Sequence, residues 1–200
     1  MSGTKRARRV AICGGIGSGK SVVCRVLRAM GYRVFDTDLE ARRIMDTDAG
    51  IHRRLNEEIH PQAVVDGRVD RRRISEVVFA SAPALAALNG IVHAAVRREL
   101  EAWFEAHCGE GDALFVETAI LYQSGLDRMV DEVWEVKAPE ELRVERVMAR
   151  NNLSASEVRA RIEAQRFEPA ERHPHVEVLI NDGSHPLLPR IEALLRGLGC

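Results

Sequence analysis

The sequence predicts a three-layer α/β fold, in which a parallel sheet of five strands lies between helices. Short apolar runs typical of buried strands alternate along the chain with segments whose apolar residues recur at helical spacing. This alternation is typical of strand–helix–strand units, which build parallel sheets. The 200 residues, 46% hydrophobic and 30% charged, suffice for one domain with inserted parts.

The first element is a strand at Val10 to Cys13, which runs into a glycine-rich segment, GGIGSGKS, at positions 14–21. The segment fits the phosphate-binding pattern G-x-x-x-x-G-K-[ST]. Apolar residues follow at helical spacing from Val22 to Met30, and Gly31 stands where a left-handed C-cap belongs. Strand, loop and helix together predict a P-loop, the nucleotide-binding loop of nucleoside-triphosphate hydrolases, and disfavour a glycine-rich turn that matches by chance.

Each part of the loop has an expected task. The glycines let backbone N–H groups turn toward phosphate oxygens, and the helix N-terminus adds partial positive charge. Lys20 is expected to reach the β- and γ-phosphates, and the Ser21 hydroxyl to ligate Mg²⁺. The residues predicted to bind a nucleoside triphosphate here are Gly14, Gly15, Ile16, Gly17, Ser18, Gly19, Lys20, Ser21 and Val22.

A second strand, Tyr32 to Phe35, leads directly into Asp36 and Asp38. Ligands of open parallel sheets bind beyond the carboxyl ends of the strands, so an aspartate there is well placed to meet an acceptor hydroxyl. Asp38 is the better candidate for a general base and Asp36 is secondary. The alternative reading, that either aspartate caps a helix starting near Leu39, remains equally open at this point.

The region from Leu39 to about His107 is predicted to be mainly helical, with Asp70 as the N-cap of one helix. A plain crossover between parallel strands needs a single helix, so the excess indicates an inserted subdomain that recognises a second substrate. Arg71 to Arg73 could bind phosphates of that substrate, although a solvated basic face is an equal alternative for Arg72 and Arg73.

A third strand, Ala113 to Val116, ends at Glu117, a second candidate for the metal site through a bound water. The alternative is that Glu117 is an ordinary charged residue of a loop. A fourth strand follows at Val133 to Val136, and Pro139 begins a helix.

Arginine is then unusually frequent, and Ser154 to Glu157 fits a capping box at the start of another helix. Two helices bearing arginines could form a lid over the transferring phosphoryl group. A hairpin with solvated charges is the alternative for any single residue. The arginines concerned are Arg146, Arg150, Arg159, Arg161 and Arg166.

The fifth strand is Val176 to Ile180, and a final helix follows with apolar residues from Leu187 to Leu195. A net charge of −1 argues against a nucleic-acid partner, and no apolar run approaches the length of a membrane span. The basic residues 5–9 are expected to form a short exposed tail and not a signal peptide. The cysteines have neither metal-type nor redox-type spacing, and we expect them to be reduced thiols of a cytoplasmic protein. They are Cys13, Cys24, Cys108 and Cys200.

The order of these motifs resembles that of the dephospho-CoA kinase family. Besides the P-loop, six segments carry the resemblance: D-x-D-x-x-A-R at 36–42, G-x-x-D-R…V-F at 67–79, L-N-x-I-x-H at 88–93, the lid entry at 145–150, and the last two signatures at 161–165 and 180–183. Together they span nearly the full chain.

The resemblance implies the nucleotide-kinase type of P-loop fold, and transfer of the ATP γ-phosphoryl group to the 3′-hydroxyl of the ribose of dephospho-CoA. By position, Asp38 matches the catalytic base, Arg71 and His93 the acceptor-binding region, and Arg146 and Arg150 the lid. It implies a nucleotide-binding core at about 8–38, 110–138 and 175–200, a helical acceptor-binding insertion at about 39–109, and a lid at about 139–174. It also implies Mg²⁺ as cofactor, no nucleic-acid or membrane partner, and a monomer or weak homo-oligomer.

Several positions depart from the family pattern. Ala94 replaces the proline of an H-P pair, Glu117 an aspartate, Gln123 the carboxylate that ends P-L-L-F-E, and Arg143 a lid glutamine, while His175-Val176 replaces an A-D pair. None of these departures falls at Lys20, Ser21 or Asp38, the residues expected to carry the chemistry. The loss of charge at Gln123 bears on acceptor affinity or identity.

Three other functions fit parts of the sequence. Another small-molecule kinase, acting on a nucleoside or a nucleoside monophosphate, would use the same loop. A nucleotide-dependent switch is disfavoured because neither the D-x-x-G nor the N-K-x-D segment of GTPases is found. A catalytically inactive binding module is disfavoured because Lys20, Ser21 and Asp38 are all present.

Overall fold

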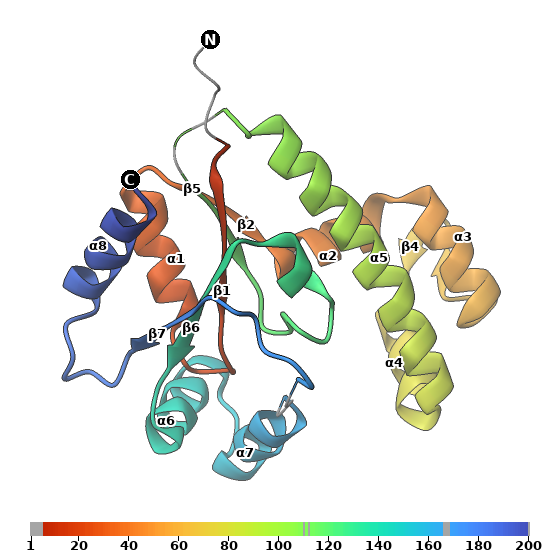
Figure 1. Ribbon diagram of the computed structural model, residues 1–200. Coiled ribbons are helices and arrows are strands. Elements are labelled where there is room, and N and C mark those ends of the chain that lie inside the picture. The colour runs from red at the N-terminus through yellow and green to blue at the C-terminus, as the bar shows by residue number, and fades with distance from the viewer. Residues whose placement is uncertain (1–5, 110, 112, 166–168, 200) are drawn as a thin grey trace. The chain divides into compact units, whose positions relative to one another are not determined.

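The structure is a computed structural model that describes residues 6–109, 111, 113–165 and 169–199 (Figure 1). The chain divides into two compact units. The first contains the described chain up to Asp36 together with the chain from Phe104 onward, and the second is Thr37–Trp103. Among the described residues, no helix combines the length and apolarity needed to cross a bilayer.

The first unit is built on a five-stranded sheet in the order β2-β5-β1-β6-β7, with every neighbouring pair parallel. The prediction of an α/β fold with a parallel five-stranded sheet is therefore confirmed. Because β1 is central, the loop that follows it opens between the ends of β5 and β6. The strands are β1 (Arg8–Cys13), β2 (Arg33–Asp36), β5 (Ala113–Glu117), β6 (Glu132–Lys137) and β7 (Val176–Ile180).

One face of the sheet is covered by α1 (Lys20–Ala29) and α8 (Leu187–Leu198), which lie side by side in Figure 1. Their apolar stripes pack onto alternate strand residues, around the rings of Phe115 and Trp134, whose centroids are 5.3 Å apart. Both aromatic side chains are fully buried. Burial of this apolar surface is the main source of stability for the layer.

Two antiparallel helices, α6 (Glu140–Asn151) and α7 (Ala155–Ala164), follow β6. The predicted capping box is confirmed, because the Ser154 hydroxyl accepts from the Glu157 backbone N–H while the Glu157 carboxylate accepts from the Ser154 N–H. A small core of valine and isoleucine holds the two helices together. A 3₁₀-helix, η1 (Leu126–Met129), lies between β5 and β6.

The second unit is mainly helical, as predicted, and also contains a hairpin that the sequence reading missed. Two-residue strands flank a turn in which Asp66 (φ 50°) and Gly67 (φ 72°) are left-handed. An Asp-Gly pair is a typical hairpin signal, but flanking strands this short give little alternation to detect. The elements are α2 (Thr37–Thr47), α3 (Ala49–Glu58), β3 (Val64–Val65), β4 (Arg68–Val69), α4 (Arg71–Ala80) and α5 (Ala82–Ala106).

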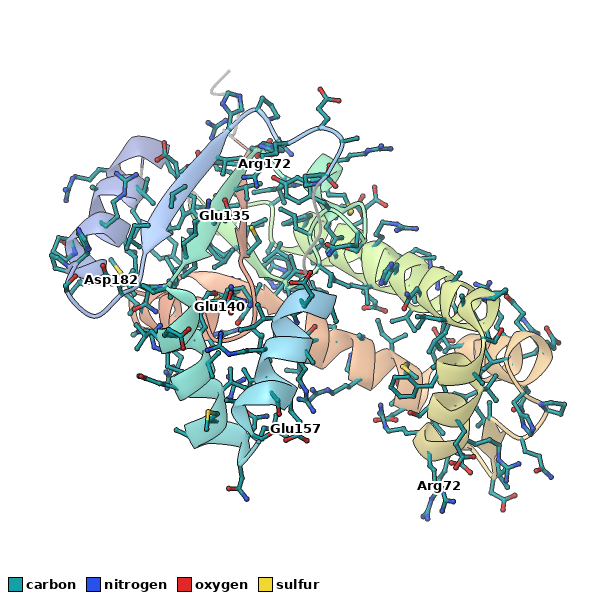
Figure 2. The ribbon with its side chains drawn as sticks, turned by 90° about the horizontal axis from the view of Figure 1, so that it is seen from below. Arg72, Glu135, Glu140, Glu157, Arg172 and Asp182 are labelled. Atoms are coloured by element: carbon teal, nitrogen blue, oxygen red, sulfur yellow. The ribbon has the colours of Figure 1, made fainter. Side chains whose placement is uncertain are left out.

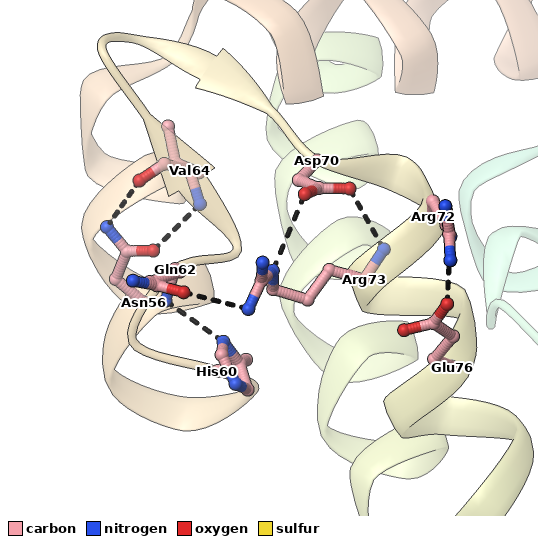
Figure 3. Close-up of polar contacts among 8 residues, drawn as sticks. All are labelled: Asn56, His60, Gln62, Val64, Asp70, Arg72, Arg73 and Glu76. Carbon is pink, nitrogen blue, oxygen red and sulfur yellow. Dashed lines mark hydrogen bonds and ion pairs between the residues drawn. The ribbon is translucent and has the colours of Figure 1, made fainter.

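Polar side chains fix this hairpin to its neighbouring helices (Figure 3). The amide of Asn56 bonds both the N–H (2.8 Å) and the carbonyl (3.2 Å) of Val64. Asp70 caps α4 by accepting from the Arg73 N–H at 2.9 Å, which confirms its predicted role. The Arg73 guanidinium donates to Gln62 at 2.8 Å, so that it braces the hairpin.

Two sequence-based boundaries were wrong. Arg8 and Arg9 are not part of an exposed tail but begin β1, where the Arg9 N–H donates to Asp131 at 2.8 Å. The guanidinium of Arg9 also stacks 4.3 Å from the Phe104 ring. Helix α2 begins at Thr37 and not near Leu39, so Asp38 lies in its first turn and is not its N-cap.

Candidate active site

The loop after β1 has the backbone that its glycines were expected to permit. Gly17 and Gly19 are left-handed, with φ values of 77° and 99°. A Cβ atom on Gly17 would also lie 2.6 Å from the backbone oxygen of Arg143. Any larger residue at Gly17 would therefore be strained and would push α6 away from the loop.

The N-terminus of α1 faces this loop without a side-chain cap. Gly19 is the N-cap residue, and the first turn contains no acidic residue. The Val22 N–H bonds back to the Gly19 carbonyl at 2.9 Å, and the Ser21 side chain lies in an exposed first-turn position. Uncapped N–H groups and the helix dipole together favour an anion at this end.

The Lys20 ammonium group lies over the loop and donates to the carbonyl of Gly14 at 2.6 Å and to that of Gly15 at 3.4 Å. Ser18 is buried, and its hydroxyl has no hydrogen-bond partner among the described residues. A buried hydroxyl normally has a partner. The loop therefore offers both a positive charge and an unsatisfied hydroxyl to an oxygen-rich ligand.

Arg146 and Asn181 hold the second half of the loop. The Asn181 amide donates to the Ser18 carbonyl at 2.9 Å. Arg146 Nη1 donates to the Asn181 carbonyl at 3.0 Å and to the Gly17 carbonyl at 3.4 Å. The loop is thus tied to α6 and to the segment after β7, which places the Arg146 guanidinium beside the phosphate-binding backbone.

Arg143 and Gln165 hold the tip of the loop at Ile16. Arg143 Nε donates to the Ile16 carbonyl at 2.9 Å, and the Gln165 side-chain oxygen accepts from the Ile16 N–H at 2.8 Å. Burial lowers the pKa of the Arg143 guanidinium, which is partly shielded from water. The carbonyl of Ile16 is therefore bonded by a residue of α6, and its N–H by the C-cap residue of α7. We call this arrangement the Ile16 clamp.

Two carboxylates stand together at the carboxyl edge of the sheet. Asp36 and Glu117 are paired residues at the ends of β2 and β5. Burial raises the pKa of Glu117, and the Asp36 charge adds to this, while a hydrogen bond with Cys24 and the charge of Lys20 oppose it. Burial likewise raises the pKa of Cys13, the last residue of β1, to about 12.

These groups suit a divalent metal bound mainly through a nucleotide. The described residues contain no cluster of three or more His, Cys, Asp or Glu side chains able to bind a metal alone. Mg²⁺ typically takes one or two protein oxygens and completes its shell with phosphates and water. The exposed Ser21 hydroxyl, with Glu117 nearby in the sheet edge, fits that donor set.

Two other arginines of the hairpin bond residues outside the loop. Arg150 is exposed and donates to the Asn151 side chain at 2.8 Å, and Arg159 pairs with Glu140 and Glu141, each at 2.7 Å. Figure 2 shows Glu140 on α6 and Glu157 on α7. Arg161 is exposed on α7, whereas Arg166, also expected in the lid, and Cys200 lie outside the described residues.

The remaining candidates belong to the second unit. Asp38 is exposed in the first turn of α2, and Arg71 pairs with Asp46 at 2.7 Å, both side chains being about half exposed. His93 is half-buried on α5, where burial first, and the charge of Arg97 second, lower its pKa. Asp38 follows Asp36, the last residue of β2, by two positions. Two residues of backbone span at most about 7 Å, so Asp38 must lie near the edge of the sheet.

Sequence reasoning gave no contact role to Arg143, Gln165 or Asn181. Gln165 and Asn181 lie within segments that carried the family resemblance, and Arg143 was noted only as a departure from it. Their contacts with the loop join residues 127 to 163 positions apart, and no local pattern reports such contacts.

Comparison with known proteins agrees with this geometry. The family model for dephospho-CoA kinase matches residues 8–186. The dephospho-CoA kinase of Bacteroides fragilis is 35% identical over 189 residues, covering 94% of this chain and 92% of that protein. The dephospho-CoA kinase of Thermus thermophilus is 40% identical over 190 residues, covering 94% and 91%.

A solved structure of a Thermus thermophilus protein is also similar, with a TM-score of 0.78, 39% identity and 97% of each chain covered. The similarity thus extends over both compact units and nearly all of the sequence. On these matches, the chain belongs to the dephospho-CoA kinase family.

Proposed function

We propose that this protein transfers the γ-phosphoryl group of ATP to the 3′-hydroxyl of the ribose of dephospho-CoA, giving coenzyme A and ADP, the last step of coenzyme A synthesis. The observation that carries the proposal is an intact P-loop, with Lys20 and Ser21 in place, in a chain that matches the family over residues 8–186.

The nucleotide half of the reaction would rest on the first unit. Backbone N–H groups of residues 14–22 and the α1 N-terminus bind the phosphates, and Lys20 exchanges its bonds to loop carbonyls for bonds to the β- and γ-phosphates. Arg146, anchored to two backbone carbonyls, contributes a fixed positive charge as negative charge shifts to the leaving ADP. Arg150, at the last turn of α6, is proposed as a further ATP contact.

Ser21 is the proposed metal ligand, with Glu117 as a second candidate acting through a water. A bound Mg²⁺ would supply charge neutralisation between the β- and γ-phosphates. Two observations support a site completed by nucleotide oxygens: the orphaned hydroxyl of Ser18, and the lack, among the described residues, of any group of three His, Cys, Asp or Glu side chains able to bind a metal.

The acceptor half is assigned to the helical insertion at 39–109, with 139–174 as the lid. Asp38 orients the ribose hydroxyl and takes its proton, while Arg71 and His93 contact the acceptor. The Arg71–Asp46 pair is exposed, so that exchanging it for a substrate phosphate costs little. The lowered pKa of His93 keeps its imidazole neutral at neutral pH, which suits a hydrogen bond to a sugar or base.

We further propose that the enzyme works in the cytoplasm, as a monomer or weak homo-oligomer, on small-molecule substrates and without nucleic-acid or membrane partners. The net charge of −1 supports small-molecule partners over nucleic acid. Cys13, Cys24 and Cys108 are free thiols, which is consistent with a reducing compartment.

A second candidate, a kinase for a nucleoside or nucleoside monophosphate, follows from Gln123, which is exposed where the family pattern has a carboxylate. An acceptor panel decides between the two. We expect ADP release with dephospho-CoA, and a product heavier by one phosphate at the 3′ position by mass spectrometry. ADP release with a nucleotide but none with dephospho-CoA would establish the second candidate instead.

A further inference from the structure

The tip of the P-loop is a turn whose central peptide group can take two orientations. The Ser18 N–H donates to the Gly15 carbonyl at 3.1 Å, so that Ile16 and Gly17 are the two central residues. Gly17 has a φ of 77°, as does the third residue of a type II turn. Turns of types I and II differ mainly by a flip of the peptide group between the central residues, and a glycine in the third position tolerates both.

The orientation of this peptide group decides where the Gly17 N–H points. In a trans peptide group the carbonyl of Ile16 and the N–H of Gly17 point to opposite sides, so a flip reverses both. Phosphate binding by a glycine-rich loop requires its backbone N–H groups to face the ligand. One of the two orientations must therefore be held if Gly17 is to contribute.

The Ile16 clamp holds this turn from three directions. Arg143 Nε donates to the Ile16 carbonyl at 2.9 Å, which fixes the central peptide group itself. The side-chain oxygen of Gln165 accepts from the Ile16 N–H at 2.8 Å, which fixes the peptide group before it. The Ile16 side chain is partly buried and packs against the small apolar core between α6 and α7. The backbone and the side chain of Ile16 are thus all held by the same pair of helices.

Gln165 is itself fixed at the end of α7. As the C-cap residue it donates its backbone N–H to the Arg161 carbonyl at 3.2 Å. Val158 and Ile162 anchor α7, since both are buried in the core of the hairpin. The N–H of Ile16 is a donor, so its partner must be an acceptor such as a carboxamide oxygen or a carboxylate. An apolar side chain of the same length could fill the space at Gln165 but could not hold the turn.

We propose that Gln165 is a positioning residue for phosphoryl transfer, which holds the turn of the P-loop in the orientation that aims the Gly17 N–H at the phosphates of ATP. This inference rests on the proposed function. Gln165 acts through Ile16 and does not touch the nucleotide. Without its hydrogen bond the turn populates both orientations, and the apparent affinity for ATP falls by the fraction of loops that remain competent. Binding of the acceptor does not depend on this turn.

The test substitutes Gln165→Met, which keeps the length of the side chain and removes the carboxamide. We expect the dissociation constant for ATP–Mg²⁺, measured by titration calorimetry, and KM for ATP to rise about threefold to tenfold, as for one lost neutral hydrogen bond. KM for dephospho-CoA should not change. Gln62→Met is the matched control, because the Gln62 side-chain oxygen accepts from Arg73 at 2.8 Å in the second unit. It loses a comparable bond and should keep the wild-type affinity for ATP–Mg²⁺.

A second variant, Gln165→Glu, separates the hydrogen bond from packing. Its carboxylate can accept the same N–H, and the Arg143 guanidinium on the other side of Ile16 offsets its charge, so we expect an affinity for ATP–Mg²⁺ within about twofold of the wild type. An unchanged dissociation constant in Gln165→Met, or equal losses in both Gln165 variants, would overturn the proposal. A wild type that binds ATP–Mg²⁺ but fails to phosphorylate dephospho-CoA would disprove the proposed function, while the dissociation constants still decide the role of Gln165.

Discussion

Asp36 and Glu117 are register partners that end neighbouring parallel strands, so the carboxyl edge of the sheet carries two adjacent acidic groups. One of them, Glu117, is partly buried, and burial together with the Asp36 charge raises its pKa. The charge of Lys20, which belongs to the P-loop, opposes this rise, as does that of Arg28. The two carboxylates therefore repel each other when both are ionised, and a cation bound at this edge would offset that repulsion.

The raised pKa of Glu117 predicts a pH-dependent stability difference between the wild type and Glu117→Gln. Because the folded-state pKa of Glu117 is raised, the folded protein holds this proton more tightly than the unfolded chain does. Wild-type stability should therefore fall, relative to the variant, as pH rises from the unfolded value of 4.5 through the folded pKa. Melting temperatures of both proteins between pH 4 and 8 measure this.

Above that pH window the difference in melting temperature between the two proteins should be constant. The stability of Glu117→Gln relative to the wild type should be highest there. Glu145→Gln on the exposed side of α6 is the control, and should show the same pH profile as the wild type. A Glu117→Gln curve that stays parallel to the wild-type curve throughout would contradict the raised pKa.

Asp38→Asn should remove most of the turnover and leave ATP binding intact, because the amide can neither take the proton of the ribose hydroxyl nor bear its charge. We expect kcat to fall about 10²- to 10⁴-fold, the usual contribution of a general base. Asp66→Asn, an equal change in the hairpin turn, should keep wild-type kcat, since asparagine accepts the left-handed conformation of that position. Near-normal turnover of Asp38→Asn would remove Asp38 from its proposed role.

Lys20→Ala should abolish the stabilisation that ATP and Mg²⁺ give to the wild type, together with turnover. The ammonium group supplies the loop's positive charge and binds two of its carbonyls, so that both the ligand and the loop lose a partner. Thermal unfolding with and without ATP–Mg²⁺ measures the effect. Lys137→Ala removes an exposed lysine paired with Glu135 at 3.1 Å and should retain the shift; loss of the shift in both variants would argue for a nonspecific charge effect.

Arg143→Gln restores the residue type of the family pattern and should loosen the Ile16 clamp. The bond from Arg143 Nε to the Ile16 carbonyl would be lost, and we expect KM for ATP to rise roughly threefold to tenfold, which corresponds to about 1 kcal/mol. Steady-state kinetics with ATP varied test this. Arg159→Gln is the matched control, because Arg159 lies on the same hairpin and pairs with two exposed glutamates, Glu140 and Glu141. This variant should keep the wild-type KM for ATP. An Arg143→Gln variant with wild-type KM would show that Gln165 alone positions the tip.

The core of the fold was predictable because its signals are local. Strands such as β5 are continuous apolar runs buried on both faces, and the P-loop is a contiguous motif between a strand and a helix. The Ser154 and Asp70 caps were recognised from neighbouring residues alone. The β3–β4 hairpin was missed because two-residue strands are too short to show alternation.

The surroundings of the loop were less predictable, because they depend on pairs of residues distant in the chain. Arg143 and Arg150 are both arginines of α6. Arg143 donates a hydrogen bond to the loop, whereas Arg150 donates to the side chain of Asn151. The orientation of a helix against its neighbours selects between them, and sequence spacing does not contain that orientation. The roles of Asp38, Arg71 and His93 stay predictions from the family pattern.

The bond between Asn181 and Ser18 has a consequence for how the protein is made. The two residues are 163 positions apart, so the loop emerges near the beginning of synthesis and gains this partner only near its end. At roughly 5–20 residues per second, the interval is about 8–33 s. During that time the loop of the nascent chain lacks the hydrogen bond that Asn181 later donates to the Ser18 carbonyl.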